Sequence, residues 1–355
     1  EPKKKPIALI IIIILLVLLV SGSAVYYFII DNPKTIFQSY ADKLLDSTKI
    51  FNNQGYEKYN LEYSLDFDIT TSDEEYEYLY AILSDFTFNG NIGYEVDFVN
   101  ILPNGQIDLK HLGELIRDDT ILVSICAVNS ETGFRQPLKT IRQVINKKNP
   151  NVIFHSDLTQ ALGKTKFYLS DLDLASFSSH KIYAPKGIGI LYKRRDLQID
   201  TLIYGTTENC PFRGGTPALP LVVAFSKAIR LMNDNFDKNV KKCEKLKSEL
   251  LKGLSKYPIQ INSNDLCVPQ IVNFSLLKIK SETFVHALEK YEVYVSTTTA
   301  CSSLEESVVL KAISNGNKDV STTSIRVSLS HLTSMEDIHD FLNIFDKVWN
   351  ELLLK

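Results

Sequence analysis

The stretch "TILVSICAV", Thr120–Val128, is an apolar run that decides the fold class. A strand that is covered on both faces has this character, because neither of its sides meets water. Helical spacing follows in "PLKTIRQVINKK" (137–148), and strand-like runs follow in "NVIFHSD" (151–157), "LDLASFS" (172–178) and "IGILYKR" (188–194). Strands that alternate with helices predict an α/β fold with a mostly parallel sheet flanked by helices.

The C-terminal part of the chain predicts a smaller α+β unit. Two long helical patterns come first, at 218–233 and 236–256. Apolar periodicity then predicts a strand at 269–276, a helix at 281–291, a strand at 324–330 and a helix at 335–353. We therefore expect two domains after residue 92: a partial large domain over 93–257 and a small domain over 258–355.

The N-terminus, residues 1–30, has the composition of a membrane anchor with a basic flank. Three lysines, Lys3 to Lys5, precede "IALIIIIILLVLLVSGSAVYYFII" (7–30), which carries no charge over its 24 residues. As one helix these residues reach about 36 Å, enough to cross a bilayer. The lysines would keep the N-terminus on the cytoplasmic side. A cleaved signal peptide is the alternative, because "SGSA" supplies small residues after the apolar core.

Residues 31–92 have a different composition, rich in Tyr, Phe, Asp and Glu. The alternation in "LEYSLDFDIT" (61–70) predicts amphipathic, antiparallel strands. We expect this segment to add no strand to the large domain, and its role is not evident from its residues.

Charge and cysteine content exclude several classes of protein. The 355-residue chain has 39 basic and 42 acidic side chains, so its net charge of -3 gives no electrostatic reason to bind nucleic acid. The five cysteines are far apart and form no Cys-x-x-Cys pair, which indicates neither a disulfide framework nor a zinc site. They are Cys126, Cys210, Cys243, Cys267 and Cys301.

Four motifs together carry a family resemblance. "HSDLTQALGK" (155–164), "SFSSHKIYAPKGIGILYKRR" (176–195), "RGGT" (213–216) and "ACSS" (300–303) resemble the bacterial cysteine desulfurases. These enzymes belong to the class V aminotransferase family, which uses pyridoxal 5'-phosphate (PLP). The resemblance covers the chain from about residue 93 to the C-terminus. It implies a PLP-dependent, aminotransferase-like sheet (fold type I) that is incomplete at its N-terminal side.

The resemblance also implies roles for the residues that would hold PLP. Lys181 would bind the cofactor covalently, and Ser178 and His180 would donate to its phosphate. Asp157 would pair with the protonated ring nitrogen, and Gln160 would hydrogen-bond the ring hydroxyl. Without the resemblance, a lysine after a strand would be a surface residue, and "SDLTQ" would be a polar cap between a strand and a helix.

Further residues would serve the substrate, the partner subunit and the sulfur. Arg326 and Asn129 would bind L-cysteine, although an arginine at a strand edge can also form an ordinary ion pair. Thr216 would reach the cofactor of a neighbouring subunit, which implies a homodimer. Cys301, in a run of small polar residues, would take the sulfur as a persulfide and pass it to an acceptor protein. Cys126, in its apolar run, fits a buried side chain better.

The sequence departs from the family in its N-terminal quarter. The family has a glycine-containing turn with a phosphate-binding threonine there, and a histidine that stacks on the cofactor ring. No histidine precedes His111 in this chain. Ser130 replaces an asparagine of the family, and Thr206 and Thr207 stand where glycine is preferred. We expect these departures to weaken PLP binding, because backbone donors at a helix N-terminus contribute much of the affinity for phosphate.

Three functional hypotheses follow. The first is a membrane-anchored cysteine desulfurase that converts L-cysteine to L-alanine. The second is an inactive desulfurase remnant that is fused to the N-terminus of a membrane protein. The third is a non-enzymatic extracytoplasmic protein that uses the α/β scaffold for binding or structure. The retained motifs favour the first hypothesis, and an exported position would favour the other two.

Overall fold

The structure is a computed structural model that describes residues 29–30, 80–88, 91–199, 212, 214–297 and 307–353. The predictions for residues 7–28, Cys210 and Cys301 fall outside these ranges. The chain divides into two compact units. Of the described residues, 29–30, 153–159, 168–199, 212 and 214–234 belong to the first unit and the others to the second.

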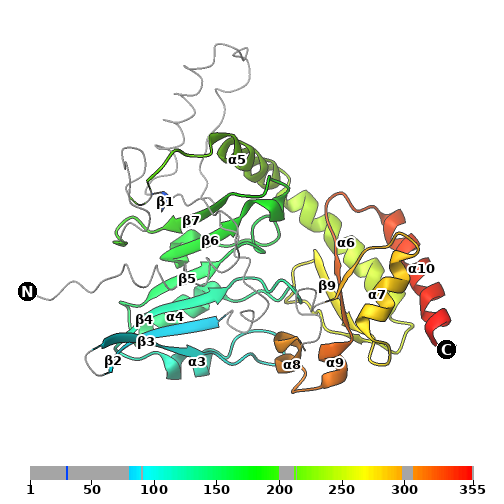
Figure 1. Ribbon diagram of the computed structural model, residues 1–355, viewed down its shortest axis with the longest axis horizontal. Coiled ribbons are helices and arrows are strands. Elements are labelled where there is room, and N and C mark those ends of the chain that lie inside the picture. Colours follow the sequence, from blue (N-terminus) through cyan, green and yellow to red (C-terminus); the bar gives the residue numbers. More distant parts are fainter. Residues whose placement is uncertain are drawn as a thin grey trace, which may run out of the picture. The chain divides into compact units, whose positions relative to one another are not determined.

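The first unit contains strands in the order β1-β7-β6-β5 (Figure 1). Strand β5 runs parallel to β6, with Asp157 opposite Ser176, and β6 runs antiparallel to β7. The elements are β1 (Ile29–Ile30), β5 (Ile153–Asp157), η2 (Leu169–Asp171), β6 (Leu174–Ser178), η3 (Ser179–Ile182), β7 (Gly189–Lys193) and α5 (Leu219–Asp234). The α/β prediction is therefore confirmed, but the sheet is mixed rather than mostly parallel.

The antiparallel pair has a simple cause in the connection between its strands. Residues 179–188 link β6 to β7 with no more than the short η3 turn. A parallel arrangement needs a crossover of a dozen or more residues, usually through a helix. The connection is too short for that crossover, so the chain returns beside β6 in the opposite direction.

The predicted helix over residues 7–30 is wrong at its C-terminal end. Ile29 and Ile30 form strand β1, which pairs in parallel with Leu191 and Tyr192 of β7. Isoleucine is β-branched and fits an extended strand at least as well as a helix. Within the described part of the chain, no helix combines the length and the apolar character that crossing a membrane requires.

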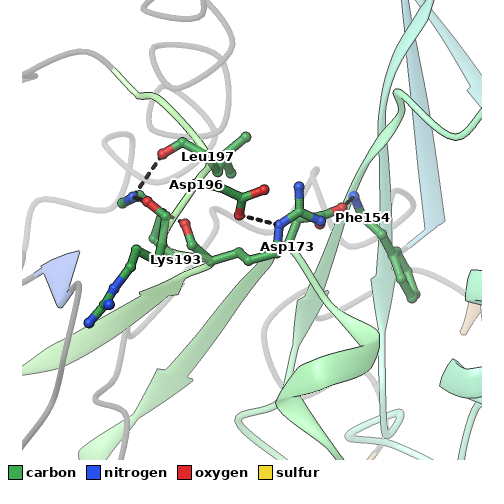
Figure 2. A network of polar contacts seen from close by, with 7 residues as sticks. Phe154, Asp173, Lys193, Asp196 and Leu197 are labelled. Atoms are coloured by element: carbon green, nitrogen blue, oxygen red, sulfur yellow. Dashed lines mark hydrogen bonds and ion pairs between the residues drawn. The ribbon is translucent and has the colours of Figure 1, made fainter.

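A buried lysine fixes the end of β7. Lys193 is only 2% exposed, and its ammonium group donates to the carbonyls of Arg194, Arg195 and Leu197 at 3.1, 3.1 and 2.7 Å (Figure 2). It also lies 5.3 Å from the centre of the Phe212 ring. Three acceptors satisfy the three protons of the ammonium group, which makes burial of the charge tolerable.

A second buried charge, the carboxylate of Asp173, lies near Lys193. The Asp173 carboxylate accepts from the backbone N–H of Phe154 at 2.7 Å and pairs with the guanidinium of Arg194 (Figure 2). Arg194 also donates to Asp196 at 2.6 Å. These contacts join the start of β5 to the segment that follows β7.

The second unit contains an antiparallel set of strands in the order β4-β2-β3. Strand β2 pairs with β3 on one side, Leu83 opposite Val96, and with β4 on the other, Ile82 opposite Val123. The elements at this end are β2 (Tyr80–Phe88), β3 (Asn91–Phe98), α3 (Leu109–Leu115), β4 (Thr120–Cys126) and α4 (Leu138–Lys148). The prediction that residues 31–92 add no strand to the large domain is thus wrong for their last part.

Local sequence explains the helices beside these strands. Asp108 precedes α3, and its carboxylate accepts from the backbone N–H groups of Lys110 and His111 at 2.9 and 3.1 Å. Such an N-cap satisfies donors that have no partner within the helix. In α4, Leu138, Ile141 and Ile145 are buried at a spacing that places them on one face.

A second sheet of this unit has the order β10-β11-β9-β8, and each of its strand pairs is antiparallel. Side chains of α6, α7 and α10 form a hydrophobic core with those of β9 and β11. Figure 1 shows α10 beside α6 and α7. The elements are α6 (Phe236–Leu254), β8 (Gln260–Ile261), β9 (Ile271–Ser275), α7 (Ser281–Glu289), β10 (Ser296–Thr297), α8 (Val308–Ile313), α9 (Lys318–Thr322), β11 (Ser324–Ser328) and α10 (Met335–Leu353).

Aromatic rings occupy the centre of this core. The Phe345 ring of α10 is fully buried and lies 4.8 Å from Tyr257 and Phe284, 5.9 Å from Phe274 and 5.9 Å from Trp349, centre to centre. Aromatic pairs at such distances add to the stabilisation that burial of their area provides. The helices and strands predicted for residues 269–353 are confirmed within a few residues at each end.

Candidate active site

In the first unit, polar side chains gather where β5 and β6 end. Strand β5 ends at Asp157 and β6 ends at Ser178, and the two strands run parallel. Parallel strands present their carboxyl ends at one edge, which is where open α/β sheets place their sites. His180 and Lys181 follow directly after β6 in η3. The structure therefore brings Asp157, Ser178, His180 and Lys181 to the same edge.

The turn that carries Lys181 is held by local hydrogen bonds. The Ser178 hydroxyl and Nδ1 of His180 are 2.8 Å apart, and the Ser179 hydroxyl donates to the Pro185 carbonyl at 2.5 Å. Tyr183 ends the turn in the left-handed conformation, with φ of 69°. Helix α5 contacts η3 from within the same unit. These contacts fix the backbone on which Lys181 is mounted.

Lys181 is exposed, and the cause is the geometry of η3. Residues three apart lie on the same side of a 3₁₀ turn, and Ser179 and Ile182 take the buried side. Lys181 is therefore left on the exposed side of the turn.

Asp157 begins a turn in which one buried polar atom has no hydrogen-bond partner among the described residues. The Asp157 carboxylate accepts from the backbone N–H of Thr159 at 2.7 Å. The Thr159 hydroxyl is buried and has no hydrogen-bond partner among the described residues. A buried polar group without a partner costs free energy, so such a group beside a carboxylate indicates a place for a polar ligand.

In the second unit, the turn after β4 also contains a buried polar atom that has no hydrogen-bond partner among the described residues. Asn129 is 1% exposed, and its side-chain oxygen accepts from the backbone N–H groups of Glu131 and Thr132 and from the Thr132 hydroxyl, at 3.0, 2.9 and 2.8 Å. Its side-chain nitrogen Nδ2 is buried and has no hydrogen-bond partner in the described part of the chain. That nitrogen is a donor available to a ligand, as the predicted role of Asn129 requires.

Arg326 lies on β11 and contacts the same turn. Its Nη1 donates to the backbone carbonyl of Ser130 at 3.2 Å. Ser130 was expected to weaken the site because the family has asparagine there. The contact with Arg326 uses only the main chain, which any residue at this position provides.

Of the other predicted residues, Gln160 directly follows Thr159, and Thr216 precedes α5. Gln160 is partly buried and belongs to the second unit, and Thr216 is exposed in the first unit. Cys301 lies outside the described residues.

Thr159, Glu131 and Ser307 were not predicted from the sequence. Thr159 stands inside a quoted motif and Glu131 directly follows Ser130, but neither was given a role. Desolvation raises the pKa of Glu131, while a hydrogen bond from Ser307 and the charge of Arg326 act in the opposite direction. Ser307 has no signal in the sequence, because it meets Glu131 only through the fold.

Comparison with known proteins relates the chain to one family. A family model described as "Aminotransferase class-V" matches residues 87–341. The chain is 34% identical to a "NifS/IcsS protein homolog" of Lactobacillus delbrueckii subsp. bulgaricus, over 76% of this chain and 71% of that protein. It is 38% identical to "Cysteine desulfurase, mitochondrial" of Saccharomyces cerevisiae, over 69% of this chain and 50% of that protein. It is 36% identical to "Cysteine desulfurase IscS" of Edwardsiella ictaluri, over 72% and 64%.

Solved structures give the same picture. A "NIFS-LIKE PROTEIN" superposes with a TM-score of 0.68 at 31% identity, over 73% of this chain and 69% of that one. A NifS-like protein from Rickettsia africae superposes with a TM-score of 0.65 at 29% identity, over 71% and 69%. The chain spans between 50% and 71% of the length of the three curated relatives.

Proposed function

The chain belongs to the class-V aminotransferase family, and from this premise we propose that it is a cysteine desulfurase that releases L-alanine from L-cysteine. The observation that carries the proposal is the group Asp157, Ser178, His180 and Lys181 at one strand edge, in a chain similar to proteins named cysteine desulfurase. Substrate, acceptor protein and homodimer belong to the proposal, since the chain matches only part of each relative.

The residues present fit PLP. The amine of the exposed Lys181 can bind the aldehyde of PLP, and the Ser178 hydroxyl and His180 imidazole can bind its phosphate. The carboxylate of Asp157 can pair with the protonated ring nitrogen of PLP. The buried Thr159 hydroxyl, in the same unit, is a polar atom without a partner among the described residues, as the lining of a polar ligand site would supply. When bound, PLP would supply an electron sink that acidifies the α-carbon of the amino acid.

The protein side chains would carry out the remaining work. Arg326 would bind the substrate carboxylate with its planar guanidinium. The Lys181 amine would take the α-proton and return a proton to the substrate carbon. The Cys301 thiolate would attack the sulfur of L-cysteine, so that a sulfur–sulfur bond forms as the carbon–sulfur bond breaks. The β-carbon of the substrate gains a proton, and the product leaves as L-alanine. The enzyme retains a persulfide for an acceptor protein.

Reduction with borohydride tests the cofactor part of the proposal. Protein incubated with PLP and then reduced should carry the pyridoxyl group on Lys181. Lys181→Ala should remove both this label and the visible absorbance of the bound cofactor before reduction. Lys186 is a matched control, because it is exposed in the same connection between β6 and β7. A label on Lys186 in the parent protein would overturn the assignment.

Product formation tests the activity. L-Alanine and sulfide should appear together from L-cysteine under reducing conditions, and Cys301→Ser should abolish the persulfide. Cys210→Ser is the control and should keep the parent rate, since Cys210 lies in no matching motif. A protein that binds PLP but forms no alanine would instead favour a role without catalysis.

The membrane anchor remains a proposal from the sequence alone. Residues 7–28 lie outside the described residues. Extraction of membranes with alkaline carbonate tests it: an anchored chain stays in the pellet, whereas release into the supernatant would contradict anchoring by this segment.

A further inference from the structure

A carboxylate that the proposed reaction does not use lies in the turn after β4. The backbone N–H of Glu131 donates to the Asn129 side chain at 3.0 Å, and its carbonyl accepts from Asn273 Nδ2 at 3.1 Å. Its carboxylate accepts from the Ser307 hydroxyl at 2.5 Å. Glu131 is thus held at three points, and desolvation of its carboxyl group raises its pKa.

The same turn contacts the arginine proposed to bind the substrate. Arg326 donates to the carbonyl of Ser130, the residue before Glu131, at 3.2 Å. Its positive charge lowers the pKa of Glu131 against the effect of burial, so the two charges interact. Asn273, which binds the Glu131 carbonyl, also pairs with Arg326 across β9 and β11. Arg326 and the turn are therefore fixed to each other from two sides.

Ser307 connects Glu131 to another part of the chain. It is 4% exposed and is the N-cap of α8, since its hydroxyl oxygen accepts from the backbone N–H of Leu310 at 3.2 Å. The hydroxyl proton goes to Glu131. Ser307 therefore fixes the Glu131 carboxylate to the start of α8.

We infer that Glu131 is a positioning residue, which holds the Arg326 guanidinium through charge and the Ser307 hydroxyl through a hydrogen bond. The inference rests on the proposed function. It assigns Glu131 a role in the alignment of the substrate, which Arg326 would bind through its carboxylate. Correct alignment of reacting groups contributes strongly to rate, so a small displacement of the guanidinium slows the reaction.

Two substitutions separate the two contacts. Glu131→Gln keeps an oxygen that can accept from Ser307 but removes the charge beside Arg326. It should raise the KM for L-cysteine about tenfold and change kcat by less than about twofold. Ser307→Ala keeps that charge but removes the hydroxyl. It releases the Glu131 carboxylate from its hydrogen bond, and it should raise the KM for L-cysteine about threefold and change kcat by less than about twofold.

Controls distinguish this role from a purely structural one. Ser307→Thr restores a hydroxyl and should recover the KM to within about twofold of the parent. Asn317→Ala removes the N-cap of the neighbouring helix α9, where the Asn317 side chain accepts from Asp319 N–H at 3.0 Å, and should leave both kinetic constants unchanged. Urea unfolding of each variant shows whether a kinetic change follows from loss of stability.

The outcomes are distinct from those of the proposed function. A parent protein that releases no alanine refutes the function and this inference with it. An active parent whose Glu131→Gln and Ser307→Ala variants keep its KM refutes the inference alone. A lower KM in Glu131→Gln would also overturn it, because Glu131 would then compete with the substrate carboxylate for Arg326.

Discussion

Acidification should destabilise the protein through one buried imidazole. His155 lies on β5, two residues before Asp157, and is 5% exposed. Its Nε2 is 3.2 Å from the Ser176 hydroxyl on β6. Burial disfavours the charged imidazolium and lowers the pKa of His155 from 6.5 to about 4.

The sign and the size of the effect follow from this shift. Between pH 6.5 and about 4, the unfolded chain binds a proton at this histidine that the folded protein does not bind. The contribution to stability is therefore complete above pH 6.5 and is lost as the pH falls toward 4. The gap between the two pKa values, at about 1.4 kcal/mol for each pH unit, makes the loss about 3 kcal/mol.

Urea unfolding at several pH values from 7 to 4 measures the effect. The His155→Gln variant has no charge at this position, so the difference in unfolding free energy between parent and variant should shrink by about 3 kcal/mol across that range. Ser176→Ala is the matched control: it removes the hydrogen-bond partner but leaves the imidazole buried, and it should keep the parent's pH dependence. Parallel curves for the parent and His155→Gln would refute the reasoning.

Four further substitutions test the packing by urea unfolding. Gly105 and Gly316 both have positive φ, 85° and 81°, but a Cβ on Gly105 would overlap the Phe134 ring, whereas one on Gly316 meets nothing within 4 Å. Gly105→Ala should cost about 3 kcal/mol or more and Gly316→Ala only about 1, and equal losses would contradict the overlap. Lys193→Met should cost about 3 kcal/mol, because the carbonyls around the ammonium group lose their donor; an unchanged stability would show that water replaces it. Phe345→Ala should cost about 4 kcal/mol, and a loss below about 1 would show that the aromatic cluster closes over the gap.

Much of the fold could be predicted because its signals are local. The buried run Thr120–Cys126 became β4, and the spacing of apolar residues in 335–353 became α10 with the same bounds. These patterns reflect burial of one strand or one helix face, which a single segment determines. The direction of β7 was missed although a signal existed, since only a short connection separates it from β6.

The parts that were missed depend on contacts between distant segments. Strand β2 forms because its backbone completes the edge of β4, and nothing in residues 80–88 alone specifies that partner. Glu131 and Ser307 are 176 residues apart, and their hydrogen bond exists only once β4 and α8 are in place. Lys181, by contrast, was placed correctly at the end of β6 from its motif, and its exposure follows from the pitch of η3.

The division of the chain between the two units limits how its gene could be cut. The chain passes from one unit to the other between β1 and β2 and again after Val152, Thr159, Phe167 and Asp234. No single break in the reading frame therefore yields either unit whole. A break after Val152, for example, would separate β1 from β5, β6 and β7 of the first unit, and β2, β3 and β4 from the later strands of the second. Exchange of one whole unit between proteins would therefore need several coordinated cuts.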